Sequence, residues 1–247
     1  MSGHSHWATI RRKKGATDSK RGQLFSKLAR QITIAARMGG GDPETNIGLK
    51  YAMDKAREYS MPKDNIERAM KKGTGELGGA VLESAQYEAI GPGGVFILIE
   101  VLTDNRNRTS AEIRKLLEMR NAHLGSVAWA FEQKGLITVP AEGVSEDQLL
   151  EVVLDAGGED MQRAGNVFQV TTAPLELYRV KKALADKGIK VEAAEVTQMP
   201  KSAVPVDADV GKKLLDLLGQ IEDHDDVQSV YSNMELPESL LASMAAE

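Results

Sequence analysis

The chain has 247 residues, with 31 Lys and Arg against 36 Asp and Glu and no Cys, and this length predicts two or three domains. The absence of Cys excludes disulfides, Cys-ligated zinc, Fe–S clusters and a thiol nucleophile. No apolar run approaches the roughly 20 residues needed to cross a bilayer, and residues 1–22 are polar and basic, unlike a signal peptide. We therefore expect a cytoplasmic protein with no membrane partner.

The charge is divided unevenly along the chain. Residues 1–79 hold 16 Lys/Arg and 8 Asp/Glu, a net charge of +8, whereas residues 80–247 carry −13. Nine of the basic residues lie within residues 1–37, where Asp18 is the single acidic residue. Such a division indicates a basic segment that meets a polyanion, carried on a body that does not. The alternative is that these charges only solubilise a helix surface.

Three short helices are predicted in the basic segment. Residues 20–38 have helical period, with an apolar face opposite a basic face. Asp42-Pro43 has the N-cap and first-turn proline of a second helix, and a third helix is predicted over about 62–72. With a flexible head, these helices are expected to form a domain over 1–79. The basic face of the first helix consists of Lys20, Lys27, Arg30 and Arg37.

The pattern then changes to strands that alternate with helices, after a Gly-rich linker over 73–85. VFILIEVL (95–102) predicts a strand, and the helix after it is expected to begin at Thr109, with Glu112 completing a capping box. SVAWAF (126–131) is predicted to be a second strand, because its large apolar residues alternate.

Residues 135–200 predict a complete βαββαβ unit, which is the ferredoxin-like order. After Pro200–Pro205, a helix over about 207–222 and a strand over about 227–233 remain, and these would complete the unit begun upstream. The sequence therefore predicts an α+β fold in which an N-terminal helical domain is followed by two ferredoxin-like α+β domains, one inserted in the other. The predicted domains are 1–79, 80–134 plus 201–247, and the inserted 135–200.

Motifs for catalysis or cofactor binding are weak. GTGELG (73–78) matches G-x-G-x-x-G by spelling, but a helix precedes it where a dinucleotide site requires a strand. His4 and His6 lack a third metal ligand nearby, and HDD (224–226) is interpreted as a solvated helix end. Since no catalytic triad or paired-carboxylate spacing is present, we expect no enzyme activity, no cofactor, no metal and no small-molecule substrate.

TDNRNRT (103–109) joins a predicted strand to a predicted helix. Arg106, Arg108 and the amides of the helix N-terminus are expected to converge on one region, which suits phosphate oxygens. In the alternative, Asp104 and Asn105 cap backbone groups and the two Arg pair internally. Spacing alone leaves both open, although two unpaired Arg in an acidic body favour a phosphate contact.

Long motifs over essentially the whole chain resemble the YebC/PmpR family. They are GHSHWATIRRKKGATDSKRGQLFSKLARQITIAARMGGGDPETN, MPKDNIERAMKKGTGE, YEAIGPGGV, LTDNRNRT, SVAWAFEQKG and HDDVQSVYSN. The resemblance implies three domains, with the last inserted into the middle one. It also implies a non-enzymatic cytoplasmic protein, either a DNA-binding transcriptional regulator or, as in members that include mitochondrial relatives, a translational activator on the ribosome that eases synthesis of polyproline.

The resemblance also implies a basic head, in which family members usually have Lys where His6 stands. The residues of the head are His4, Trp7, Arg11, Arg12, Lys13, Lys14, Lys20 and Arg21. The Gly-rich loop that usually precedes Ser126 is shortened here, which affects contacts of that loop rather than the fold. With the helix face and the 103–109 loop added, the candidate nucleic-acid-binding residues are His4, Trp7, Arg11, Arg12, Lys13, Lys14, Lys20, Arg21, Lys27, Arg30, Arg37, Arg106 and Arg108.

Three classes of function remain: duplex-DNA binding with transcriptional control, ribosomal RNA binding with translational control, and a protein-interaction module. In the first two, Lys and Arg neutralise phosphates and release counterions. A DNA regulator also needs a recognition helix, for which 20–38 is the candidate, whereas Trp7 suits stacking on RNA. On the resemblance we predict a DNA-binding transcriptional regulator, with the ribosome/rRNA-binding translation factor and the interaction module as alternatives and the oligomeric state left open.

Overall fold

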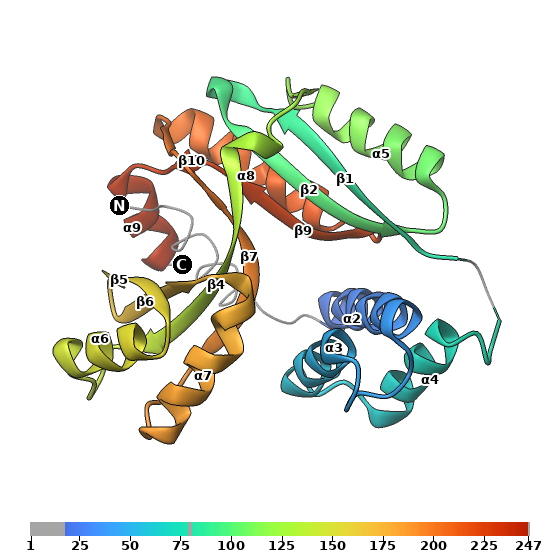
Figure 1. Ribbon diagram of the computed structural model, residues 1–247. Helices are drawn as coiled ribbons and strands as arrows, with labels where there is room; N and C mark the ends of the chain where they lie inside the picture. Colours follow the sequence, from blue (N-terminus) through green and yellow to red (C-terminus); the bar gives the residue numbers. More distant parts are fainter. Residues whose placement is uncertain (1–17, 79–80, 247) are drawn as a thin grey trace. The chain divides into compact units, whose positions relative to one another are not determined.

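The computed structural model describes residues 18–78 and 81–246 (Figure 1). It divides into two compact units: the described chain up to residue 127 together with 206–232, and residues 128–205 together with the chain from 233 on. A helical N-terminal part is followed by mixed helix-and-sheet domains with antiparallel sheets, so the predicted α+β fold class is confirmed. The domain boundaries drawn from the sequence stay a prediction.

The helical part consists of α2 (Asp18–Gly39), α3 (Ile47–Glu58) and α4 (Lys63–Gly73), which pack around one apolar core (Figure 1). The predicted apolar face of α2 is confirmed, because its residues at helical spacing are buried in this core. The buried side chains of the core are Leu28, Ile32, Ala36, Leu49, Met53, Ala56, Met61, Ile66 and Ala69.

The beginning of α3 differs from the prediction. The expected N-cap, Asp42, lies in a turn, where its Oδ1 accepts a hydrogen bond from the Glu44 amide at 3.0 Å. The N-cap is Asn46, whose Oδ1 accepts from the Leu49 amide at 3.0 Å and whose Nδ2 donates to the Ala35 carbonyl at 2.8 Å. This buried amide both donates and accepts, so it joins the end of α2 to the beginning of α3. An Asp carboxylate, which has no N–H to donate, cannot do both.

The middle domain is built from two separated stretches of the chain. Its strands pair antiparallel in the order β3-β1-β2-β9, and its two helices contact each other and the sheet. This is the ferredoxin-like spatial order, except that β1 comes before β2 in the chain instead of after β3. Its elements are β1 (Glu83–Ile90), β2 (Phe96–Thr103), α5 (Arg106–Glu118), β3 (His123–Leu124), α8 (Ala208–Glu222) and β9 (Val227–Ser232), with a short η1 turn (Pro92–Gly94) between β1 and β2.

Strand β1 overlaps the end of the linker predicted over 73–85, which is therefore wrong for residues 83–85. It begins at Glu83 and pairs with β2 along its whole length, up to Ile90 opposite Phe96. The sequence ESAQYEAI has few large apolar residues, and so it carries no strand signal of its own. The strand forms because β2 and β3 supply its hydrogen-bond partners on both sides.

The strand predicted over 126–131 is also wrong. Ala128–Ala130 form a 3₁₀ turn, η2, and only Phe131 belongs to a strand. Trp129 is 65% exposed, whereas Val127 and Phe131 are buried. Alternate residues of a strand share one face, so these three side chains cannot lie on a strand that runs through all of them.

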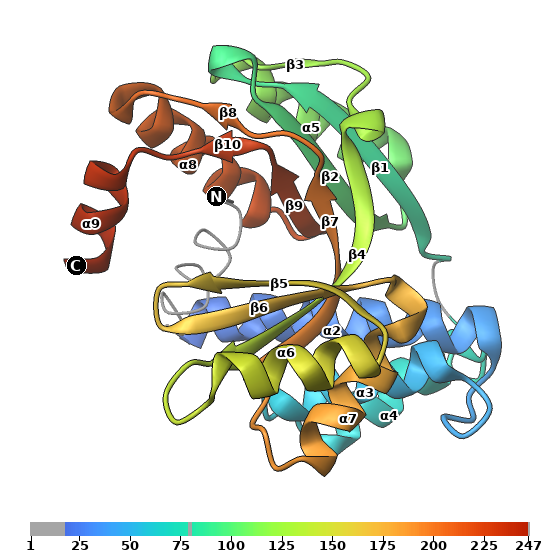
Figure 2. The same ribbon diagram turned by 60° about the vertical axis from the view of Figure 1, so that its left-hand side comes forward.

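The inserted domain has the predicted βαββαβ order, and its strands pair antiparallel in the order β5-β6-β4-β7. Figure 2 shows α6 and α7 on one face of this sheet, where their apolar residues form a core with Ile137, Val139, Phe168 and Val170. The ferredoxin-like prediction is confirmed here. The elements are β4 (Phe131–Pro140), α6 (Glu146–Asp155), β5 (Gly158–Ala164), β6 (Val167–Thr172), η3 (Pro174–Glu176), α7 (Leu177–Asp186) and β7 (Ala193–Pro200).

We expect residues 131–200, excised, to fold without the rest of the chain, because the sheet and its core lie inside this segment. The amide NMR spectrum should be dispersed and thermal unfolding cooperative. The shorter fragment 135–200 is the control: it lacks the first residues of β4, which pair with β7 from Phe131 opposite Pro200, and should melt at a lower temperature. Collapsed amide signals from the longer fragment would refute the boundary.

The last elements follow the inserted domain. β8 (Val204–Pro205) pairs in parallel with β10 (Met234–Glu235), and α9 (Glu238–Ala246) ends the described chain. Leu240 of α9 is buried. Within residues 18–78 and 81–246, no helix is both long and apolar enough to pass through a membrane.

Candidate nucleic-acid interface

The middle of the predicted basic face of α2 lies against the middle domain. Lys27 Nζ donates a hydrogen bond to the Glu222 carbonyl at 2.5 Å. Arg30 Nη1 donates to the carbonyls of Leu102 at 3.1 Å and Asp225 at 2.7 Å. While these contacts are made, neither side chain is free to neutralise a phosphate.

The two ends of α2 are more open. Residues 27–36 are all buried or half-buried, whereas Arg21 and Arg37 are exposed. The Arg21 guanidinium lies 5.7 Å from the centre of the Phe25 ring. Of the other predicted residues, Lys20 belongs to α2 by its backbone. The predicted residues that lie outside the described part of the chain are His4, Trp7, Arg11, Arg12, Lys13 and Lys14.

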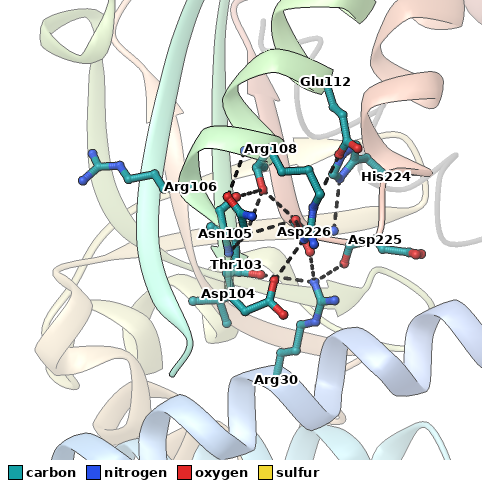
Figure 3. Close-up of polar contacts among 12 residues, drawn as sticks. Arg30, Thr103, Asp104, Asn105, Arg106, Arg108, Glu112, His224, Asp225 and Asp226 are labelled. Carbon is teal, nitrogen blue, oxygen red and sulfur yellow. Dashed lines mark hydrogen bonds and ion pairs between the residues drawn. The ribbon is translucent and has the colours of Figure 1, made fainter. Parts of the chain in front are cut away.

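Asp226 is the centre of a polar network between α2, the end of β2 and α5 (Figure 3). Its side chain is only 2% exposed. Oδ1 accepts from Arg30 at 2.6 Å, and Oδ2 accepts from Arg108 at 2.8 Å and from the Thr109 hydroxyl at 2.6 Å. The Thr103 hydroxyl lies 3.1 Å from Oδ2. One buried carboxylate therefore holds an arginine of the helical part and an arginine of the middle domain.

The pKa of Asp226 is shifted by opposing effects. Burial raises it, because a carboxylate loses hydration in a low dielectric. Hydrogen bonds from Thr109, Arg108 and Arg30 stabilise the ionised form and outweigh burial, so the pKa lies well below the ordinary aspartate value. Asp226 is therefore ionised in the folded protein at neutral pH.

The beginning of α5 differs from the predicted capping box. The helix begins at Arg106, and its N-cap is Asn105, whose Oδ1 accepts from the Arg108 amide at 3.1 Å. Thr109 lies inside the first turn, and its buried hydroxyl contacts Asp226 instead of capping a helix end. The predicted capping box does not form because the Thr109 hydroxyl donates to the carboxylate of Asp226, which is distant in the sequence.

Arg106 and Arg108 do not converge. Arg108 pairs with Asp226 and, at 3.0 Å, with Asp104, which is the internal pairing that the sequence left open. Figure 3 shows the Arg106 side chain pointing away from this network, and Arg106 is exposed with no ion pair to any residue that the structure describes. Arg108 therefore has a structural role here, and a phosphate contact at Arg106 stays a prediction.

These different positions give a direct test. Replacing Arg108 by Ala should lower the free energy of unfolding measurably, because Asp226 loses a charged hydrogen-bond donor, although water reduces the effect since Arg108 is 44% exposed. Replacing Arg106 by Ala, the matched control, should change it by less than about 0.5 kcal/mol. Urea unfolding followed by circular dichroism measures both, and equal effects would contradict this assignment.

His224 and Asp226 are not the solvated helix end that the sequence indicated. The His224 side chain is 13% exposed, and its Nε2 lies 2.9 Å from Glu112 Oε2. Nδ1 accepts from the Asp226 amide at 3.1 Å, so the proton of the neutral ring lies on Nε2, which donates to Glu112. Among the described residues, no three His, Cys, Asp or Glu side chains form a group that could hold a metal.

Comparison with known proteins supplies the family. The family model for the TACO1/YebC protein N-terminal domain matches residues 5–76, and the model for the TACO1/YebC second and third domain matches residues 82–234. This chain belongs to the TACO1/YebC family. The resemblance noted from the sequence motifs is therefore confirmed.

Relatives of this TACO1/YebC chain match nearly all of it. A probable transcriptional regulatory protein from Dictyoglomus turgidum is 49% identical, over 99% of this chain and all of its own length. A probable transcriptional regulatory protein from Chlorobium chlorochromatii is 52% identical over the same shares. The crystal structure of a conserved hypothetical protein from Aquifex aeolicus is 44% identical, covers 89% of this chain and 92% of its own, and has a TM-score of 0.80.

Proposed function

We propose that this TACO1/YebC chain is a non-enzymatic, cytoplasmic regulator of gene expression that binds nucleic acid through its basic N-terminal part and acts as a DNA-binding transcriptional regulator. The observation that carries the proposal is the division of charge, +8 in residues 1–79 against −13 in the remainder. The names of the relatives, probable transcriptional regulatory proteins, support the regulatory role.

The geometry of α2 indicates how binding is achieved. Lys27 and Arg30 are held by the middle domain, so the middle of α2 does not act as a recognition helix against base edges. The remaining cations are those of the head and of the exposed surface of the helical part. Such cations contact phosphates and fix position on the backbone without reading sequence.

This observation also favours a second candidate, a ribosome-binding translation factor that helps synthesis of difficult stretches such as polyproline. Binding to folded ribosomal RNA needs no helix in a major groove. A basic head that contains Trp7 supplies phosphate contacts and a side chain that stacks on unpaired bases. The resemblance to this family implies both activities, so membership of the family agrees with either candidate.

Crosslinking in cells, followed by sequencing of the bound DNA and RNA, distinguishes the candidates. Enrichment of discrete chromosomal regions, with changed transcription of adjacent genes on deletion, supports the transcriptional regulator. Enrichment of ribosomal RNA without such regions supports the translation factor. Recovery of neither nucleic acid above an untagged control contradicts both and leaves the protein-interaction module.

A further inference from the structure

Apart from Arg21, which lies over the Phe25 ring near the beginning of α2, the exposed cations of the helical part are of two kinds. In the first kind, each cation has a carboxylate partner on its own surface. Lys50 Nζ lies 3.8 Å from Glu44, and Arg57 Nη1 lies 2.7 Å from Asp54. Lys63, on the first turn of α4, pairs in the same way with Glu67 at 3.5 Å.

The second kind forms a separate group, which we call the end patch: Arg37, Arg68, Lys71 and Lys72. All of its members are exposed, and none forms an ion pair with the residues described by the structure. Arg68, Lys71 and Lys72 are spaced i, i+3 and i+4 along α4, so they share one face of the last turns. Arg37 is in the last turn of α2.

Close packing brings the ends of α2 and α4 together. The Thr33 hydroxyl of α2 donates to the Ala69 carbonyl of α4 at 3.0 Å. One turn later, Gly73 lies so near α2 that an added Cβ would be 2.7 Å from Ala36 Cβ and would collide with the Thr33 carbonyl oxygen. Because glycine permits this approach, the cations of both last turns lie at one end of the helix pair.

The acidic groups near this end have other partners. Glu76 Oε1 accepts from the Thr74 hydroxyl at 2.9 Å, and Asp42 Oδ1 accepts from the Glu44 amide. Thr74 contacts the loop that carries Asp42, since a Cβ added to Gly41 would be 2.7 Å from Thr74 Cγ2. These neutral donors leave both carboxylates charged, but the four cations of the end patch outnumber them, so the end patch keeps a local excess of positive charge.

A structural explanation accounts for part of this group. Cations in the last turn of a helix stabilise the negative end of its dipole, and this applies to Arg37, Lys71 and Lys72. It does not apply to Arg68, which lies one turn farther from the end of α4. The dipole effect predicts a loss of stability on substitution and no loss of ligand binding, and so the two roles can be separated.

We propose that the end patch is a second phosphate-binding surface, which contacts the same nucleic acid as the basic head. The inference rests on the proposed function, and it adds Arg68, Lys71 and Lys72 to the candidate nucleic-acid-binding residues predicted from the sequence. α2 has 22 residues and is about 33 Å long at about 1.5 Å per residue. The end patch is at one end of α2, and in the sequence the head joins the other end. The length of α2 between them corresponds to about 10 base pairs of B-form DNA.

The test compares two triple variants of the full-length chain that remove equal charge from the helical part. The patch variant carries Arg68→Gln, Lys71→Gln and Lys72→Gln. The control variant carries Lys50→Gln, Arg57→Gln and Lys63→Gln, which removes cations that already have carboxylate partners. Fluorescence anisotropy with a 30-base-pair duplex DNA and with a structured RNA of similar length is measured over a series of KCl concentrations.

For at least one probe, we expect the patch variant to bind about tenfold to a hundredfold more weakly at moderate salt. The slope of log affinity against log salt should fall by about 2–3 on duplex DNA, or by about 2 on RNA, because three phosphate contacts are lost. The control variant should keep the wild-type slope to within about 0.5. The probe that shows the loss identifies the nucleic acid that the patch contacts.

Equal affinities of the patch and control variants for both probes would overturn the inference. A lowered melting temperature with unchanged binding would also overturn it and assign the cations to the helix dipole. If circular dichroism shows that the triple patch variant is unfolded, the same binding and melting measurements are made on the single variant Arg68→Gln. Arg68 lies outside the last turn of α4, so the helix dipole does not account for a loss of binding in this variant. A wild-type chain that binds neither probe would refute the proposed function itself, whereas loss of binding in a head variant but not in the patch variant would refute only the patch.

Discussion

Replacing Asp226 by Ala is expected to lower the free energy of unfolding by about 3 kcal/mol. Removing one member of a buried ionic network leaves its partners without compensation, and this costs more than a surface pair contributes. Arg30 and Arg108 would lose their shared carboxylate, and the buried hydroxyls of Thr103 and Thr109 would lose an acceptor. Since Arg108 is 44% exposed, water replaces part of its interaction, and so the figure is at the lower end of the range for buried pairs.

The adjacent Asp225→Ala is the matched control for this measurement. Asp225 is exposed, and it contacts Arg30 through its backbone carbonyl, which the substitution preserves. The free energy of unfolding, measured with urea, should therefore change by less than about 0.5 kcal/mol. If Asp225→Ala were as destabilising as Asp226→Ala, the network would not be centred on the buried carboxylate.

The same residue should make stability depend on acid pH. The pKa of Asp226 is lower in the folded protein than in the unfolded chain, so its ionised form contributes stability above the unfolded value, about 3.9. That contribution is lost as the pH falls below this value toward the folded pKa. The stability of the wild-type chain should thus decrease more steeply below about pH 4 than that of Asp226→Ala.

Replacing Arg11, Arg12, Lys13 and Lys14 by Ala is expected to weaken nucleic-acid binding by several tenfold at moderate salt. These residues hold four of the nine positive charges in residues 1–37. If each neutralises one phosphate, the slope of log affinity against log salt should fall by up to about 3–4. Anisotropy titrations of a labelled duplex DNA and a structured RNA over a range of KCl concentrations measure both quantities.

A variant with four exposed lysines of the other domains replaced by Ala controls for the change in net charge. The lysines are Lys182, Lys187, Lys190 and Lys212. Because these lie in the acidic remainder of the chain, the slope should stay within about 0.5 of wild type. A head variant with an unchanged slope would show that the affinity does not come from the head.

Much of the fold was predictable because it depends on local pattern. The apolar face of α2, whose Leu28, Ile32 and Ala36 are buried, follows from helical period alone. The inserted βαββαβ unit follows from strands and helices that each carry their own signal. Strand β1 was missed because ESAQYEAI has no such signal, and its structure comes from its neighbours in the sheet.

The candidate interface was predictable only as a concentration of positive charge. The sequence shows that residues 1–79 are basic, since charge is a property of composition. It does not show which cations are available, because an ion pair depends on residues far apart in the chain. Arg30 and Arg108 were both candidates for phosphate, yet both meet Asp226, at sequence separations of 196 and 118 residues.

Residue order and composition are therefore enough to establish the family, the α+β class and the basic character of the N-terminal part. Contacts between distant parts of the chain decide the rest: the middle of α2 is covered, Asp226 is buried and ionised, and Arg68, Lys71 and Lys72 are exposed without ion pairs to the residues that the structure describes. The physical reason is that exposure and pairing of a charged side chain depend on what packs beside it. In α2, Lys27 contacts the last residue of α8, and Arg30 contacts Asp225 and Asp226 in the turn that follows, nearly 200 residues later in the chain.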